Sequence, residues 1–265
     1  MSVAGVAATR LLVEDTLRVI RGLGADDWAC DSACPGWRVQ DVIVHMAAFF
    51  HTVADPTSAP DEPTGLAERI NDAAVRERAH WGWEQAAEYY AEKSSAGLVL
   101  LEGIQAPEYA EVTMPVAELG TYRLAELSNA FAFDHLVHLS SDLLAPFGPI
   151  AQDAVAMDAD RIGPALDWML AGLPQMCGTA LAPVLTRPLG VDLRGPAARR
   201  FVLRPGAEPG TVQLDEDAPL PGDVARSSTV DFLRWATTRT DWRTAVTIDG
   251  DPSFVAPVLT AVNVI

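Results

Sequence analysis

The hydrophobic pattern of the chain changes near residue 150, and this change constrains the fold more than any other feature. Before it, apolar residues recur with the 3.6-residue period of an amphipathic helix, as Leu12, Val19 and Leu23 do. After it, short runs typical of β-strands alternate with helical patterns. The sequence therefore predicts an α+β protein, with a helical first half and a small α/β domain in its second half.

Long helical segments are predicted throughout the first half. One lies around residues 12–23, and three more lie at about 39–53, 81–103 and 124–145. A Pro-rich loop at 54–65 connects the second of these segments to the third. Four long helices with connections of this kind indicate a four-helix bundle. Asp41 lies near the start of the second segment, where its carboxylate meets the positive end of the helix dipole favourably.

The second half is predicted to contain both strands and helices. A helical pattern covers residues 153–176. Short β-like runs follow at 190–193, 201–203, 211–214 and 245–248, with helical patterns at 229–238 and 253–264. We therefore expect a helical-bundle domain at 1–150, a connecting helix at 151–178 and a small α/β C-terminal domain at 179–265.

The acidic charge of the chain argues against several classes of function. The 19 Lys and Arg residues are outnumbered by 36 Asp and Glu, which leaves a formal net charge of −17. This charge repels phosphate backbones and anionic lipid surfaces, so we expect neither a nucleic-acid nor a membrane partner. The longest apolar run, residues 42–50, is broken by His45 and is too short to span a bilayer.

The cysteine content and the N-terminal pattern together predict where in the cell the protein is located. The first twenty residues form an amphipathic pattern that contains acids, unlike the basic-then-apolar order of a signal peptide. The chain has three cysteines, which cannot form a disulfide framework. We therefore expect a cytoplasmic protein whose partners are small molecules. The oligomeric state is left open by the sequence.

The positions of the histidines are the most informative chemical feature. The chain has five, His45, His51, His80, His135 and His138. His45 shares a helical face with the apolar Val42 and Phe49, so this face is expected to point into the bundle. Asp134 and His138 lie four residues apart, on one face of the last bundle helix and among apolar neighbours.

A carboxylate and imidazoles on buried faces are costly to desolvate unless something compensates for the lost water. A divalent metal would do so, since three protein ligands with an open fourth position are typical of catalytic zinc sites. A buried Asp–His ion pair explains the same spacing without a metal, and this alternative stays open. A ligand pair of His135 and His138 is ranked second, because His135 lies more to one side of the helix.

Three segments resemble a known family. The run Cys34-Pro-Gly-Trp-Arg-Val-Gln-Asp-Val-Ile-Val-His45 resembles the CPGW-T/S-V-x-D-V-x-x-H signature of the mycothiol-dependent maleylpyruvate isomerase family, a branch of the DinB-like four-helix metalloproteins. Asp134-His-Leu-Val-His138 is similar to the second signature of that family, E-x-x-x-H. Asp231-Phe-Leu-Arg-Trp235 and the residues that follow it resemble the small α/β domain that often comes after the bundle.

The resemblance implies a DinB-like bundle that holds zinc, or another divalent metal, through His45, Asp134 and His138. It also implies that the sulfur of a low-molecular-weight thiol, mycothiol, takes the open metal position. The implied activity is isomerisation of, or S-transfer to, a small electrophilic metabolite by the activated thiol. A non-catalytic metal- or small-molecule-binding bundle of the same fold is the alternative.

The chain departs from the family pattern at three positions. Arg38 stands where the family usually has Thr or Ser, so the hydroxyl expected at the helix N-cap is missing. The candidate ligand Asp134 replaces the usual Glu. The family often reads His-x-x-Asp after its second histidine, whereas Asp142 follows this histidine by four residues. The Asp in place of Glu and the displaced Asp142 keep the non-catalytic alternative open.

Two further features have competing interpretations. Trp37 is expected to hold its loop onto the bundle, with a place in the pocket wall as the less favoured interpretation. Arg199 and Arg200 could clamp a substrate carboxylate, although a solvated pair at the start of a strand is favoured.

Overall fold

The computed structural model describes residues 2–265. The chain divides into two compact units, Met1–Ala156 and Met157–Ile265. The first unit contains the segments predicted as a bundle, and the second contains the predicted strands. No helix in the described part of the chain is both long and apolar enough to cross a membrane.

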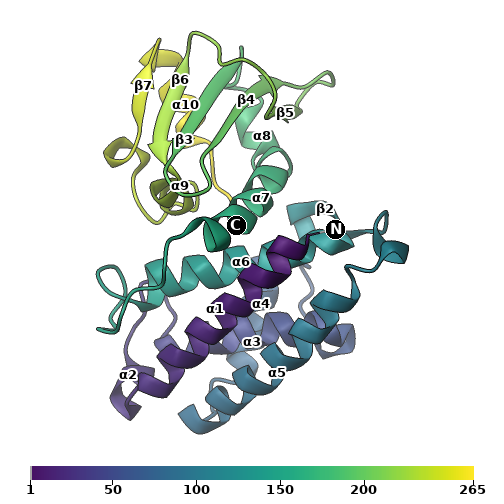
Figure 1. The fold of residues 1–265 in the computed structure, drawn as a ribbon, viewed down its shortest axis with the longest axis vertical. Helices are drawn as coiled ribbons and strands as arrows, with labels where there is room; N and C mark the ends of the chain where they lie inside the picture. Colours follow the sequence, from purple (N-terminus) through teal and green to yellow (C-terminus); the bar gives the residue numbers. More distant parts are fainter. Residues whose placement is uncertain (1) are drawn as a thin grey trace. The chain divides into compact units, whose positions relative to one another are not determined.

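Four helices form the framework of the first unit (Figure 1). They are α1 (Val3–Gly22), α3 (Val39–Ala54), α5 (Trp83–Gly103) and α6 (Leu127–Val137), which continues directly into a π-helix (His138–Leu143). α3 packs along α5, and α1 packs along α6. The predicted helical bundle is therefore present, in a chain of mixed α+β class.

Shorter elements connect the bundle helices. They are α2 (Ala25–Ala29), α4 (Ala67–Glu77), the hairpin strands β1 (Thr113–Val116) and β2 (Gly120–Arg123), and 3₁₀ turns at Pro56–Ser58, Pro107–Tyr109, Ala117–Leu119 and Leu124–Glu126. Neither α4 nor the hairpin was predicted from the sequence. α4 has only 11 residues, is polar overall and buries only Ala74 and Val75, so its apolar face is small. Each hairpin strand has four residues, too few to display a period of two.

A glycine permits the close packing of α3 on α5. Gly97 of α5 lies against Phe50 of α3, and a Cβ built at this glycine would overlap the Phe50 ring. The buried Phe50 ring stacks on Phe131 of α6, with the ring centroids 4.4 Å apart. The helices that carry the candidate ligands are thus held together by a close-packed aromatic core.

The second unit is built on a five-stranded sheet (Figure 1). Its strands are β3 (Leu189–Arg194), β4 (Arg199–Pro205), β5 (Val212–Asp215), β6 (Val224–Ser228) and β7 (Thr247–Asp249), in the order β5-β4-β3-β6-β7. β3 and β6 are parallel, and the other neighbours are antiparallel. β6 was not predicted, because its sequence Val-Ala-Arg-Ser-Ser offers little apolar signal.

The second unit also contains helices, most of which contact strands of the sheet. They include α7 (Ala159–Met176), α8 (Gly178–Leu181), α9 (Thr229–Trp235) and α10 (Pro252–Thr260), with a 3₁₀ turn at Trp242–Thr244. Phe232 of α9 meets Phe201 of β4, with the ring centroids 6.3 Å apart. Because successive residues of a strand point to opposite faces, Arg200 and the residues paired with it lie on the other face of the sheet.

Candidate metal centre

The N-terminus of α3 is stabilised in a way that replaces the missing hydroxyl. The Asp41 carboxylate accepts a hydrogen bond from the backbone N–H of Arg38 (2.9 Å), as in a capping box. The Arg38 guanidinium also donates to this carboxylate through Nε (3.0 Å) and Nη2 (2.9 Å), and these hydrogen bonds raise the pKa of Arg38. α3 therefore begins securely and carries His45 inward, where this residue is buried.

The end of α6 positions the other two candidate ligands. Asp134 lies in α6, and His138 begins the π-helix. In this wider turn the carboxylate of Asp142 comes back onto His138, with 2.7 Å between Nδ1 and Oδ2. The acid that stands one residue late in the sequence thus still reaches the histidine. π-Helical turns of this kind often occur at functional sites.

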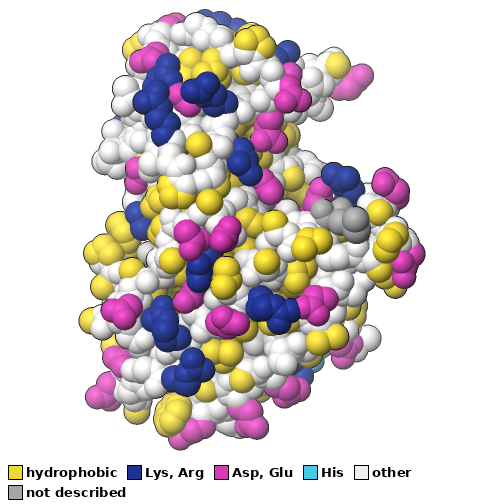
Figure 2. Space-filling model, viewed as in Figure 1, with side chains coloured by type: hydrophobic (Ala, Val, Ile, Leu, Met, Phe, Trp, Pro, Cys, Tyr) yellow, Lys and Arg dark blue, Asp and Glu magenta, His cyan; other side chains and the backbone are white. Residues whose placement is uncertain are grey.

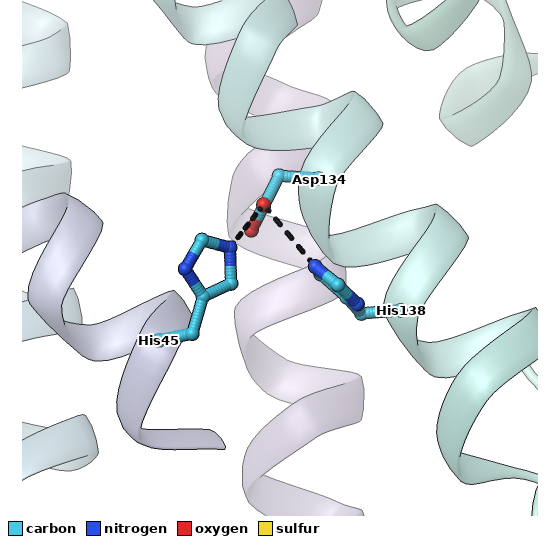
Figure 3. A group of neighbouring side chains, drawn as sticks. All are labelled: His45, Asp134 and His138. Carbon is cyan, nitrogen blue, oxygen red and sulfur yellow. Dashed lines mark hydrogen bonds and ion pairs between the residues drawn. The ribbon is translucent and has the colours of Figure 1, made fainter. Parts of the chain in front are cut away.

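The two histidines converge on the Asp134 carboxylate (Figure 3). Oδ1 of Asp134 lies 3.0 Å from His45 Nε2 and 3.6 Å from His138 Nε2. One ligand atom from each residue lies within 4.8 Å of the other two. Among residues 2–265 this is the one group of three or more His, Cys, Asp or Glu side chains so arranged. Two imidazole nitrogens and a carboxylate oxygen are a donor set that suits zinc.

The hydrogen bond to Asp142 determines the tautomer of His138. Because a carboxylate can only accept, Nδ1 of His138 carries the proton and Nε2 presents its lone pair toward Asp134. Burial lowers the pKa of His138, although the carboxylates of Asp134 and Asp142 act in the opposite direction. A neutral imidazole held by a carboxylate is the usual arrangement of a zinc-binding histidine.

Asp134 has one oxygen left over. Burial on its own would raise its pKa, but the nearby His45, His135 and His138 hold the pKa well below its ordinary value. Oδ2 is buried and has no hydrogen-bond partner. The nearest ring nitrogen, His135 Nδ1 at 3.4 Å, is already bonded to the carbonyl of Phe131 (3.0 Å). An unpaired buried acceptor costs about 1–3 kcal/mol, which a cation bound here would remove. The residues present therefore fit a divalent metal.

His135 has a structural role instead. Its Nδ1 donates to the Phe131 carbonyl, so its Nε2 accepts a hydrogen bond from the hydroxyl of Tyr90 (3.0 Å). Both ring nitrogens are thus engaged, and the ring is fully buried. Burial also raises the pKa of Tyr90, which keeps its hydroxyl protonated as a donor. The alternative ligand pair that includes His135 is not supported by this geometry.

Trp37 borders the site and also anchors its loop. The indole ring lies with its centroid 5.0 Å from that of His45. Its Nε1 donates to Asp72 of α4 (3.1 Å), which ties the loop to the bundle as expected. The less favoured interpretation, that Trp37 lines the site, therefore holds as well. The sequence signal for it was the position of Trp37 in the same signature as His45.

The other histidines and the cysteines are not members of this group. His51 Nδ1 lies 3.0 Å from the hydroxyl of Tyr89, and His80 is exposed. None of the three cysteines forms a disulfide, and Cys177 is buried. None of these side chains joins the candidate centre in the described residues.

Arg199 and Arg200 do not form one clamp. Arg199 Nη2 donates to Asp167 of α7 (3.1 Å), whereas Arg200 Nε donates to Asp192 of β3 (3.1 Å). The two side chains leave opposite faces of β4, because they are consecutive in a strand.

Fold and site together define a helical-bundle protein with a candidate three-ligand metal centre, joined to a separate mixed α/β unit. Residues 9–140 match the family model of the mycothiol maleylpyruvate isomerase N-terminal domain, and the chain belongs to this family. The family resemblance predicted from the two bundle signatures is confirmed.

Two solved structures have a fold similar to that of this chain. A crystal structure of the mycothiol-dependent maleylpyruvate isomerase shares 16% sequence identity, covers 92% of this chain and 91% of its own, and superposes with a TM-score of 0.53. A histidine-to-alanine variant of such an isomerase shares 14% identity with the same coverage, 92% and 91%, and a TM-score of 0.54. At these identities the likeness shows the fold, and the predicted α+β class is confirmed. No curated protein matches the sequence.

Proposed function

We propose that the chain is a thiol-dependent isomerase in which His45, Asp134 and His138 bind zinc. One observation carries the metal site: a buried carboxylate lies between two histidine nitrogens and keeps an oxygen without a hydrogen-bond partner. Family membership supports mycothiol as the thiol. The names of the similar structures support a small electrophile such as maleylpyruvate as the substrate.

Each residue of the centre has a distinct task in this proposal. His45 and His138 supply nitrogen ligands from two different helices, and Asp134 supplies an oxygen ligand and a negative charge. Asp142 keeps the His138 proton on Nδ1, so that Nε2 is free to ligate. Trp37 places an aromatic ring beside His45, with the ring centroids 5.0 Å apart.

The reaction class follows from thiol chemistry. Bound zinc would favour the thiolate form of a thiol that ligates it, so that a nucleophile exists at neutral pH. In isomerisation a thiolate adds to an activated double bond, the resulting single bond rotates, and the thiolate leaves. In S-transfer the sulfur stays attached to carbon or displaces another group. Family membership favours isomerisation, and S-transfer is the alternative reaction of the same thiolate.

Metal content tests the centre independently of turnover. Elemental analysis of the wild-type chain should find about one zinc per chain, and the zinc should be lost in His45→Ala and in His138→Ala. His80→Ala removes an exposed histidine outside the group and should retain the metal. If the wild-type chain holds no metal and all variants stay folded, the three residues are a hydrogen-bonded cluster and the zinc proposal fails.

Turnover tests the reaction. Zinc-loaded chain is mixed with mycothiol and maleylpyruvate, the loss of substrate is followed by absorbance, and the product is identified by mass spectrometry. An isomer of unchanged mass supports the isomerase, and a stable thiol adduct supports S-transfer. Zinc binding without either product favours the non-catalytic alternative. We also propose a cytoplasmic location, which three cysteines without a disulfide support.

A further inference from the structure

The sheet of the second unit has a polar face on which arginines gather. Arg200 of β4, Asp192 of β3 and Arg226 of β6 lie side by side in register across three neighbouring strands. Arg194 lies two residues beyond Asp192 and so on the same face. Figure 2 shows basic side chains gathered over β3 and β6, with an acidic side chain between them. In a chain of net charge −17, this local excess of cations is unusual.

A single buried carboxylate organises these arginines. The Asp192 side chain is 3% exposed and accepts hydrogen bonds from Arg194 Nη2 (3.2 Å), from Arg200 Nε (3.1 Å) and from Arg226 Nη1. Burial on its own would raise the pKa of Asp192, but the hydrogen bonds from Arg200 and Arg194 outweigh it, and the pKa is lowered. Asp192 therefore stays ionised and holds three guanidinium groups close together.

The charges of this cluster do not balance. Arg226 also pairs with Asp249, through Nε at 2.7 Å, so three guanidinium groups are matched by two carboxylates. The excess positive charge lies at Arg194 and Arg200, whose side chains are 67% and 69% exposed. By contrast Arg204, which lies on the same face of the sheet, has Asp215 as a carboxylate of its own at 2.9 Å.

We propose that Arg194, Arg200 and Arg226 form a binding site for the oxyanion group, carboxylate or phosphate, of a small molecule. Guanidinium groups bind such groups through paired, charge-assisted hydrogen bonds. Because Asp192 already holds the three guanidinium groups by hydrogen bonds, their side chains lose little further freedom when an anion binds. The outer N–H groups of the two exposed arginines supply the donors, and the anion removes the excess charge. The residues of this site all belong to the second unit, and the proposal does not depend on the candidate metal centre.

NMR of the full-length chain tests the site directly. Inorganic phosphate and, in a second arm, acetate are titrated at constant ionic strength against chloride, and the arginine Nε–Hε cross-peaks are followed. Arg194→Gln and Arg200→Gln assign two of the peaks, and Arg204→Gln is the matched control from the same face. Both test residues are mainly exposed, so the variants should fold, which their backbone amide spectra will verify.

The expected result is a saturable shift of the Arg194, Arg200 and Arg226 peaks, with the Arg204 peak unmoved. Losing one charged donor should weaken anion binding about tenfold in Arg194→Gln and in Arg200→Gln, as measured from the shift of the Arg226 peak. Arg204→Gln should bind the anion with the affinity of wild type. Tighter binding in the phosphate arm assigns a phosphate ligand, and tighter binding in the acetate arm assigns a carboxylate ligand. Shifts that never saturate and that Arg204 shares, or an affinity unchanged in both test variants, would overturn the proposal.

Discussion

Substitution of Asp142 tests whether the π-helix serves the metal centre. In the wild-type chain the Asp142 carboxylate accepts a hydrogen bond from His138 Nδ1 at 2.7 Å, and both residues are buried. In Asp142→Ala this acceptor is lost, so the ring can turn or move its proton to Nε2, where it blocks the lone pair. Loss of such a partner typically lowers metal affinity about 10- to 100-fold, equivalent to about 1.4–2.8 kcal/mol.

The assay is zinc competition with a chromophoric chelator, performed on folded protein at neutral pH. Asp142→Asn should lie between wild type and Asp142→Ala, because an amide oxygen still accepts the hydrogen bond but carries no charge. Ser141→Ala, a buried neighbour in the same π-helix, is the control for general disturbance of this turn and should bind zinc as wild type does. Urea unfolding of each variant separates the loss of stability from the loss of affinity.

Two results would refute this reasoning in different ways. If Asp142→Ala binds zinc within about twofold of wild type while remaining folded, the hydrogen bond does not tune His138. If Ser141→Ala loses as much affinity as Asp142→Ala, the effect belongs to the shape of the turn and not to the carboxylate. In a chain that binds no zinc, Asp142→Ala should only lower the free energy of unfolding, by about 1–3 kcal/mol, because a buried donor has lost its acceptor.

Three further predictions concern packing, pH and thiol reactivity. Gly97→Ala forces a methyl group against the Phe50 ring. We expect the free energy of unfolding, measured with urea, to fall by about 1–2 kcal/mol after the gain in helix propensity is subtracted. A variant as stable as wild type would contradict the packing argument. Asp192 has a lowered pKa, so its stabilising effect is present above its ordinary value of 3.8 and is lost as the pH falls through the lower folded-state value. In urea unfolding, the free energy of unfolding of Asp192→Asn should therefore be about 1–2 kcal/mol lower than that of wild type at neutral pH. This difference should become smaller as the pH falls below 3.8, and a difference that stays constant with pH would contradict the lowered pKa. A thiol reagent should label the exposed Cys30 of the native chain but should label Cys177 only after unfolding, because burial both shields the Cys177 thiol and raises its pKa. Mass mapping of the labelled peptides measures the order of labelling, and labelling of Cys177 in the native chain would disprove the prediction.

Local sequence patterns predicted α3 and α5 closely, whereas α1 begins nine residues before the predicted segment. The apolar stripe and the acid at its start predicted α3 from Val39 onward, and α5 begins within two residues of its predicted start. These elements form through contacts between residues three and four apart, which a sequence displays directly. The same locality explains why Asp134 and His138 could be assigned to one helical face before their neighbours were known.

Elements that depend on distant partners were harder to predict. β6 is stabilised by pairing with β3 and β7 on either side, and its own residues show little apolar alternation. The hairpin likewise depends on the register of Thr113 with Arg123 and not on any periodicity in its short strands. Strand pairing joins residues far apart in sequence, so the decisive contacts are invisible until the chain is folded.

The sequence by itself determined which residues of the candidate centre share a helix face and which family the bundle resembles, because helix geometry and signature spacing are local properties. Only the tertiary structure brought His45 of α3 to within 3.0 Å of Asp134 on α6 and left one carboxylate oxygen unpaired. It also brought Asp142 back onto His138 through a π-helix, and it gathered three arginines from three strands around Asp192. These arrangements depend on how separate elements pack and pair, and that is determined by the buried core as a whole.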